Sequence, residues 1–171
     1  SETRWSLVGQ ATPLMSLSST FYHYTGGAHG IYGADALLFD TELESVMQPI
    51  DIFADRDAAR AAIQPEYCDL LDTERERRRG PDYPRVDDDD SFWDCIDPLE
   101  QTLIFHPDEG SEGVFDRLIV YAGPYAAGPY AEGEFVIEMP VTAALIAAIK
   151  PEYRRAFAVS DKPALTEQAG E

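Results

Sequence analysis

The chain has 171 residues, of which 44% are hydrophobic and 11% aromatic, and this is enough for one domain with a hydrophobic core. Its 13 basic and 32 acidic residues give a formal net charge of −19. A field of this sign repels nucleic acids and anionic membranes and attracts basic proteins or divalent cations, so a nucleic-acid-binding function is disfavoured. A surface adapted to solubility or salt has the same composition.

The start of the chain contains no targeting signal. It lacks the basic and apolar regions of a signal peptide, and no apolar run reaches the roughly 18 residues of a membrane span. The chain begins with Ser1 instead of methionine, which predicts a processed or trimmed product and is compatible with the earlier removal of a leader.

Two strands are predicted around a glycine-rich loop. Residues 14–24 alternate small polar and aromatic side chains, which is typical of a strand with one wetter face. Residues 25–33 contain 4 glycines, so they form a loop that needs positive φ angles or a close backbone approach. Residues 34–40 are apolar again. The three segments predict an antiparallel pair with an elaborate connection.

Helical structure is predicted to begin at residues 50–53 and to continue through an alanine-rich stretch to Ile63. Pro65 is suited to the first position of a second helix, because its missing N–H has no partner there in any case. Gly80 and Pro81 end this helix.

Arginines gather near the predicted end of this second helix, within residues 75–79. Cations at a helix C-terminus offset the helix dipole, and Glu74 precedes Arg78 by four residues in the favourable order. The arginines therefore indicate a structural role first.

The second half of the chain predicts more strands than helices. After a polar connection over residues 82–97, strands are expected at 103–105, at 115–122 as a central strand, and at 134–139. In the last of these, Phe135, Ile137 and Met139 alternate with more polar residues and are expected to point inward.

A short final helix is predicted from a Thr142 cap to about residue 149, before Pro151. The residues after 158 are expected to be disordered. The strands do not alternate with helices as in β-α-β units, so the fold class is α+β. Residues 1–158 form a single domain, with 159–171 as a tail.

A second glycine- and tyrosine-rich segment spans residues 123–133, with the sequence Gly123-Pro-Tyr-Ala-Ala-Gly-Pro-Tyr-Ala-Glu-Gly133. Tyrosine offers a large rigid contact area, proline pre-organises a loop, and glycine allows a close backbone approach, which is typical of protein-recognition loops. The alternative is a wide hairpin connection whose tyrosines pack on the sheet.

Catalytic and cofactor motifs are absent from the sequence: we find no nucleophile elbow, phosphate-binding loop, dinucleotide fingerprint or paired metal-ligand motif. His23 and His29 could join His106 in a zinc site, but a hydrogen bond from His29 that locks its loop is the better interpretation. The acidic run 87–90 lacks the glycine and glutamate of a calcium loop, so at most loose cation association is expected. No cofactor and no resident metal are predicted.

The motifs together resemble a known domain family. They are Tyr24-Thr-Gly-Gly-Ala-His-Gly30, Phe39-Asp40, Asp51-Ile-Phe53, Pro124-Tyr-x-x-Gly-Pro-Tyr-x-x-Gly133 and Met139-Pro140. As a set they are similar to the extracellular domain of RsiV-type anti-sigma factors, which is also related to the non-catalytic region of PdaC-type peptidoglycan deacetylases and to a secreted mycobacterial antigen. The similarity covers roughly residues 14–157.

The resemblance implies a curved, mostly antiparallel sheet packed against one long helix, with a shorter C-terminal helix. It also implies a non-catalytic periplasmic or extracellular domain, anchored to the membrane in the full-length protein, that binds lysozyme, another basic protein or a cell-wall glycan. The alternative is a peptidoglycan hydrolase or deacetylase with a site centred on His29. Family members carry a companion segment before the first motif, so either this chain is a piece of a longer protein or it has lost that half.

Carried over by motif, the binding residues come from both turns. The first turn contributes Thr25, Gly26, Gly27 and His29, and the second contributes Pro124, Tyr125, Gly128, Pro129 and Tyr130. The two cysteines, Cys68 and Cys95, are compatible with one disulfide or with two buried free thiols. The resemblance favours the disulfide.

Overall fold

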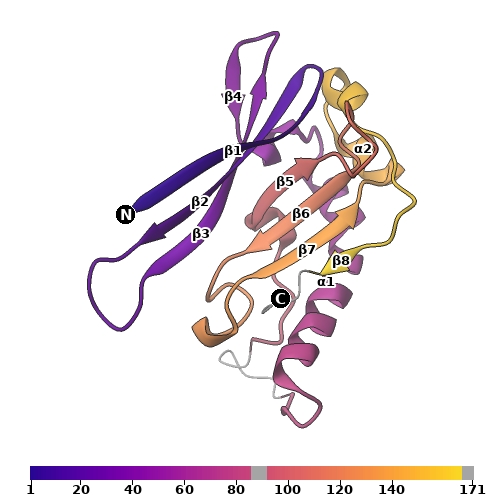
Figure 1. Cartoon of the computed structure of the whole chain (residues 1–171). Helices are drawn as coiled ribbons and strands as arrows, with labels where there is room; N and C mark the ends of the chain where they lie inside the picture. The colour runs from indigo at the N-terminus through magenta and orange to yellow at the C-terminus, as the bar shows by residue number, and fades with distance from the viewer. Residues whose placement is uncertain (86–91, 167–171) are drawn as a thin grey trace.

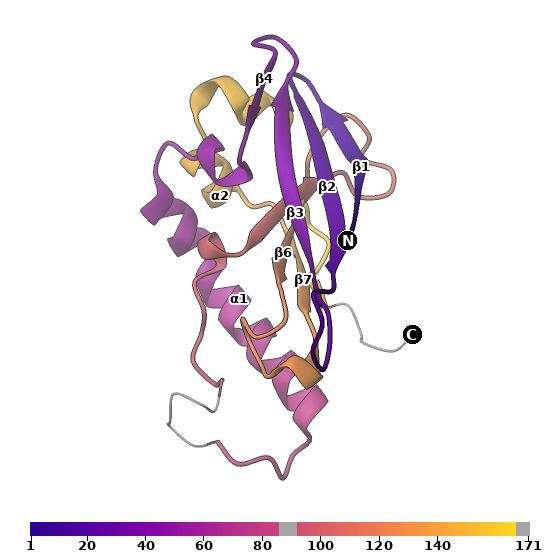
Figure 2. The same cartoon turned by 90° about the vertical axis from the view of Figure 1, so that its left-hand side faces the viewer.

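The computed structural model of the protein describes residues 1–85 and 92–166, and it has an α+β fold with two four-stranded antiparallel sheets (Figures 1 and 2). The first sheet has the order β1-β2-β3-β4 and the second the order β5-β6-β7-β8. The strands of the first sheet are β1 (Glu2–Ala11), β2 (Leu14–His23), β3 (Ile31–Asp40) and β4 (Ser45–Met47). The predicted antiparallel pair is confirmed as β2 and β3.

The second sheet consists of β5 (Thr102–His106), β6 (Arg117–Ala122), β7 (Phe135–Pro140) and β8 (Leu165–Thr166). The predicted central strand is confirmed, because β6 pairs with β5 on one side and with β7 on the other. Phe135, Ile137 and Met139 are buried as expected. This face of the sheet covers the long helix α1 in Figure 1.

Helix α1 (Arg56–Arg79) is a single helix, so the prediction of a second helix opening at Pro65 is wrong. Buried residues recur every fourth position on both sides of the proline, at Ala59, Ile63, Tyr67 and Leu71, and all four join the core cluster. This continuous apolar stripe holds the helix together across Pro65, which removes one backbone hydrogen bond. The freed carbonyl belongs to Ala61, which is exposed to water.

The helix ends have ordinary capping chemistry, and two of them, at Gly80 and Thr142, were predicted. Asp55 caps α1 by accepting a hydrogen bond from the Ala58 N–H at 2.9 Å, and Gly80 ends it with a φ of 84°. Helix α2 (Ala143–Ala148) begins after Thr142, whose hydroxyl accepts from the Leu145 N–H at 3.2 Å. Short 3-10 helices complete the fold: η1 (Pro49–Ile52), η2 (Pro98–Glu100), η3 (Tyr130–Glu132) and η4 (Pro151–Ala156).

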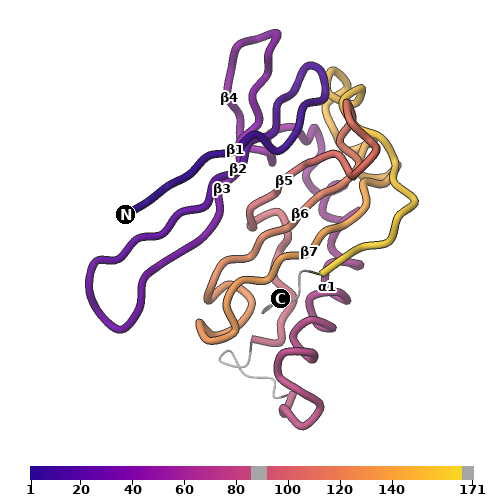
Figure 3. The backbone as a smooth tube through the Cα atoms, viewed as in Figure 1, coloured from indigo at the N-terminus to yellow at the C-terminus, as the bar shows by residue number. Residues whose placement is uncertain are grey.

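Strand β1 was not foreseen, because most of Glu2–Ala11 is exposed and carries no clear apolar alternation. It pairs with β2 from Leu14 to Tyr22, with a bulge between Leu7 and Gly9. Strands β1 to β3 extend beyond the second sheet as an arm, and the loop after β2 lies at its tip (Figures 1 and 3). The arm therefore carries the first glycine-rich turn away from the main core.

The predicted disordered tail is corrected as far as residue 166, because β8 pairs with β7 and continues the second sheet. The buried Arg117 guanidinium holds the preceding segment by donating to the carbonyls of Lys162 at 3.0 Å and Pro163 at 2.8 Å. The sequence did not predict this contact, because Arg117 binds backbone carbonyls that any residue carries. Residues 167–171 lie outside the described part of the chain.

Candidate functional site

The two glycine- and tyrosine-rich turns meet in space, although they are 100 positions apart in the chain. The Tyr130 hydroxyl donates to the Gly30 carbonyl at 2.9 Å, and the His29 ring stacks on the Tyr130 ring at 3.7 Å between centroids. The centroids of the Tyr125 and Tyr130 rings are 5.5 Å apart. We call His29, Tyr125 and Tyr130 the turn surface. Figure 2 shows the loop after β2 beside the orange second turn.

The first turn is exposed from Tyr24 to His29. Gly26 and Gly27 have φ angles of 99° and 107°, a conformation that other residues adopt with strain. The Tyr24 hydroxyl donates to the Gly27 carbonyl at 3.1 Å across the turn. Thr25 lies exposed beside this contact. The predicted positive φ angles of the loop are confirmed.

His29 forms the loop-locking hydrogen bond that the sequence predicted. With a proton on Nδ1, the ring donates to the Gly30 carbonyl at 3.1 Å and leaves Nε2 as an acceptor for the Tyr125 hydroxyl at 3.5 Å. Both ring nitrogens thus serve contacts within and between the turns.

The second turn packs more tightly than the first. Ala127 and Gly128 are buried, and a Cβ on Gly128 would collide with the Glu132 carboxylate and lie 3.1 Å from the Phe135 ring. Pro124 and Pro129 are partly buried, and Pro129 is the N-cap of η3. Tyr125 has a φ of 70°, which is strained for a tyrosine, and its side chain is 57% exposed.

Arginines of α1 hold the second turn through hydrogen bonds and an ion pair. Arg75 donates to the Ala127 carbonyl at 2.9 Å, and Arg78 donates to the carbonyls of Glu132 and Glu134, the latter at 2.8 Å. Arg79 forms a two-pronged pair with the Glu132 carboxylate at 2.7 and 2.9 Å. These arginines were assigned only to the helix end from sequence, and their contacts across the fold were missed.

Glu74 neutralises part of this arginine group within the core. Its side chain is 2% exposed and pairs with Arg77 at 2.6 Å and Arg78 at 2.9 Å, which confirms the predicted i,i+4 pair. Burial alone raises the pKa of Glu74, but the hydrogen bonds from Arg77 and Arg78 hold it below its usual value. The ion pair therefore stays charged inside the protein.

The predicted disulfide between Cys68 and Cys95 is present, with a Cα–Cα distance of 5.4 Å. It fixes the segment that follows residue 91 against α1. In that segment the Trp93 carbonyl accepts from Arg75 at 3.2 Å and the Phe92 carbonyl accepts from Arg79 at 3.3 Å. The same two arginines therefore connect the disulfide-bonded segment to the second turn.

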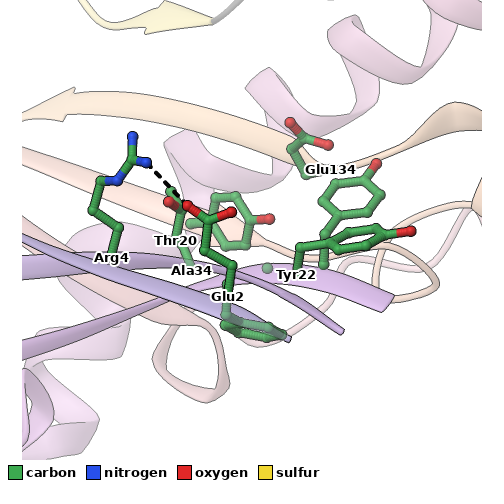
Figure 4. A pocket seen from close by; sticks show the side chains of 10 residues that line it. Glu2, Arg4, Thr20, Tyr22, Ala34 and Glu134 are labelled. Carbon is green, nitrogen blue, oxygen red and sulfur yellow. Dashed lines mark hydrogen bonds and ion pairs between the residues drawn. The ribbon is translucent and has the colours of Figure 1, made fainter. Parts of the chain in front are cut away.

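A cleft of about 330 Å³ opens beside the turn surface, between the arm and the second sheet. We call this space the cleft; its principal side chains are Glu2, Arg4, Tyr22, Tyr32, Tyr121 and Glu134. In Figure 4, Glu134 lies across from the residues of the arm, with the Arg4–Glu2 ion pair near one end and Tyr22 near the other. Sequence reasoning missed the cleft because its residues come from distant strands.

The phenols of the cleft lie close to the Glu134 carboxylate. Burial, followed by a hydrogen bond to Glu134, raises the pKa of Tyr32 to about 12. Burial and then the charge of Glu134 raise the pKa of Tyr121 as well. Tyr32 also contacts Tyr130 edge to face at 6.1 Å, so the cleft and the turn surface are continuous.

The histidines considered for a zinc site lie apart. His106 pairs with Glu138 at 2.6 Å on the second sheet, whereas His29 belongs to the turn surface and His23 is exposed at the end of β2. Within the described residues, no group of three or more His, Cys, Asp and Glu side chains is arranged to hold a metal ion. The acidic run 87–90 lies outside those residues.

No helix within residues 1–85 and 92–166 combines the length and apolar character needed to cross a membrane.

Comparison with known proteins identifies fold neighbours. No protein-family model and no curated protein matches the chain. Among solved structures, it is similar to a DUF3298 family protein from Pseudomonas aeruginosa PAO1, with a TM-score of 0.50 and 16% identity over 91% of this chain and 62% of that one. A DUF3298 member from Bacteroides fragilis NCTC 9343 gives a TM-score of 0.49 and 20% identity over 86% and 52%. The chain thus spans less than two thirds of either neighbour, and the first likeness shows a fold shared with a DUF3298 protein, a domain of unknown function.

Proposed function

We propose that this chain is a non-catalytic binding domain that works outside the cytoplasm and recognises a basic protein with the turn surface. The observation that carries the proposal is the meeting of the two turns, in which Tyr130 hydrogen-bonds Gly30 at 2.9 Å and stacks on His29. Two loops that are distant in sequence form one aromatic surface with exposed tyrosine.

The turn surface has the physical character of a recognition site. Tyr125 offers an exposed ring, and the second turn behind it is held by the arginines of α1. A surface that is already rigid loses little conformational entropy when a partner binds, so more of the contact energy contributes to affinity.

The charge of the chain supports a basic partner. A net charge of −19 attracts a cationic protein over several ångströms and speeds its association at low salt. The RsiV-type domains that the motifs resemble bind lysozyme, which is basic, so a lysozyme is the first partner to test.

The disulfide supports a location outside the cytoplasm. Disulfides persist in the periplasm and outside the cell and are rare in the reducing cytoplasm. The resemblance adds an anchor to the membrane through a part of the protein beyond this chain.

A binding titration with a basic lysozyme tests the proposal. Isothermal calorimetry at low and moderate salt is expected to give a 1:1 complex that weakens as salt is added, because screening reduces the attraction. Tyr125→Ala is expected to weaken binding by more than about tenfold, since exposed aromatic anchors contribute over 1 kcal/mol in such interfaces.

Leu43→Ala is the control, because Leu43 is an exposed apolar residue, 71% against 57% for Tyr125, at the β3–β4 turn, away from the turn surface. It is expected to bind like the original protein. Complete absence of association removes lysozyme as the partner, and equal affinity of the Tyr125→Ala protein contradicts the assignment of the turn surface.

A further inference from the structure

We propose that the cleft receives a single cationic side chain, a lysine or an arginine, from the protein that binds the turn surface. The identity of the partner rests on the proposed function above. The cleft itself is a separate site with its own chemistry and is tested separately.

The cleft combines aromatic rings with a carboxylate. Tyr22 comes from β2, Tyr32 from β3 and Tyr121 from β6, while Glu134 directly precedes β7. Cations bind favourably over aromatic faces, and more strongly where water is partly excluded. With a volume of about 330 Å³, the cleft has room for an extended side chain.

Glu134 determines the sign of the charge that the cleft accepts. It lines the cleft together with Tyr32 and Tyr121, and after burial its charge is a further cause of the raised pKa of both phenols. Among the ion pairs of the described residues none includes the Glu134 side chain, and the neighbouring Arg78 guanidinium donates to the Glu134 backbone carbonyl and pairs with Glu74. A carboxylate that lines an open space beside phenol rings attracts a guanidinium or ammonium group and repels anions.

The position of the cleft suits a partner on the turn surface. The Tyr32 ring contacts Tyr130 at 6.1 Å between centroids. The Tyr32 hydroxyl also lies 3.2 Å from where a Cβ on Gly133 would be, so the backbone of the second turn passes close to it. A side chain that leaves the turn surface therefore reaches Glu134 across one aromatic ring.

The chain carries a cation of its own at the mouth of the cleft. Arg4 pairs with Glu2 at 2.9 Å, and both side chains are largely exposed. An exposed pair of this kind contributes little to stability, but its positive charge opposes the entry of another cation. Removing Arg4 is therefore expected to strengthen binding, whereas removing the charge of Glu134 weakens it.

Small cations test the cleft without the rest of the partner. We suggest following the tyrosine and backbone NMR signals while adding n-propylguanidinium or n-butylammonium, with n-butylurea as the neutral control. The two cations are expected to shift the signals of Tyr22, Tyr32 and Tyr121 with millimolar affinity, and the urea to leave them unchanged. Shifts of equal size with n-butylurea contradict the proposal.

Two charge-matched pairs of variants separate local from overall electrostatics. Glu134→Gln is expected to weaken cation binding about fivefold to tenfold, and Glu66→Gln, on the exposed side of α1, to leave it nearly unchanged. Arg4→Gln is expected to strengthen it about twofold to fivefold, whereas Arg56→Gln, at the start of α1, has a smaller effect. Equal effects within either pair overturn the proposal.

The failure of this inference is distinguishable from failure of the proposed function. If lysozyme binds, and Tyr125→Ala abolishes that binding while Glu134→Gln does not change it, the turn surface stands and the cleft is excluded. If the small cations bind and lysozyme does not, the cleft stands and the basic partner is a different protein.

Discussion

The two turns have similar compositions, but the rest of the fold holds the second turn in place and leaves the first largely exposed. The first turn, at the tip of the arm, is exposed from Tyr24 to His29 and depends on short contacts within itself and on Tyr130. The second turn has buried residues at its centre and is held by three arginines of α1. Glycine and tyrosine content therefore does not determine how rigid a turn is. The rigidity of a turn depends instead on buried hydrogen-bond donors that bind its backbone carbonyls.

The largest effect is expected from Arg78→Ala, which would break the support of the second turn. The Arg78 side chain is 9% exposed, pairs with Glu74 and lies 4.0 Å over the Phe135 ring. Its loss leaves two carbonyls without their donor, removes one of the two arginines that pair with the buried Glu74 carboxylate and empties the space over Phe135, which together cost about 3–5 kcal/mol of unfolding free energy. Urea denaturation measures this cost.

Arg77→Ala is the matched control for Arg78→Ala. Arg77 also pairs with Glu74, but its side chain is 40% exposed, so water replaces much of what is lost. We expect a cost below about 1 kcal/mol. Equal losses in the two variants would show that the second turn does not depend on its buried donor.

Reduction of the disulfide is expected to cost nearly as much. On the chain-entropy relation, opening a bridge over a sequence separation of 27 lowers the unfolding free energy by about 3.5 kcal/mol. Because Arg75 and Arg79 join the bridged segment to the second turn, amide exchange should accelerate around Ala127 more than around Gly27. Hydrogen exchange with and without reductant measures this, and uniform acceleration argues against the connection.

A methyl group on a glycine of each turn tests the comparison directly. Gly128→Ala drives a Cβ into the Glu132 carboxylate, which Arg79 holds, so it should cost about 1–3 kcal/mol. Gly26→Ala meets no atom within 4 Å and suffers only from its φ of 99°, which the exposed loop can relax. We expect less than about 1 kcal/mol there by thermal unfolding. The reverse order would show that the first turn is the more constrained.

Removal of one hydroxyl should loosen the first turn alone. Tyr130→Phe keeps the stacking on His29 but loses the hydrogen bond to the Gly30 carbonyl, worth about 1 kcal/mol. Exchange of the amides of residues 25–30 should accelerate, while those near Ala127 stay protected. Faster exchange in both turns would mean that they form one cooperative unit.

The smallest expected effect is a loss of stability at high pH. It involves one tyrosine in the cleft beside the turns and one at the opposite end of the fold. Burial raises the pKa of Tyr32 and of Tyr153 to about 12, with hydrogen bonds to Glu134 and Asp40 as the second causes. Since both values exceed the ordinary 10.0, the stability from these phenols is complete below pH 10 and is lost as the pH rises toward 12. Tyr32→Phe and Tyr153→Phe should each reduce this loss in denaturation curves. A protein whose stability is constant from pH 9 to 12 would contradict the raised values.

Much of the fold could be predicted where local rules agree with packing. The strand over 134–139 alternates strictly, and Thr142 caps α2, so both were found. Pro65 was misread because a local breaker signal was stronger in the sequence than a stripe of buried residues around it. Strand β1 was missed because its order comes from pairing with β2 and not from its own composition.

The candidate site was predictable only in part. The two turns stand out by composition, but their contact at Gly30 depends on how the arm lies against the second sheet. Arg78 was recognised by its spacing from Glu74, a local relation, whereas its bonds to Glu132 and Glu134 span more than 50 positions. Long-range donors of this kind leave no periodic signal.

The bulge and charges of β1 have a consequence for the behaviour of the protein in solution. In the described sheet β1 has a neighbouring strand on one side only, so its other side presents unpaired peptide groups along much of Glu2–Ala11. Such an edge can recruit further chains into fibrils. Glu2 and Arg4 place charges along it, the irregularity between Leu7 and Gly9 interrupts its flatness, and the strongly anionic body repels its own copies. We therefore expect these features together to disfavour edge-to-edge association of this long open strand.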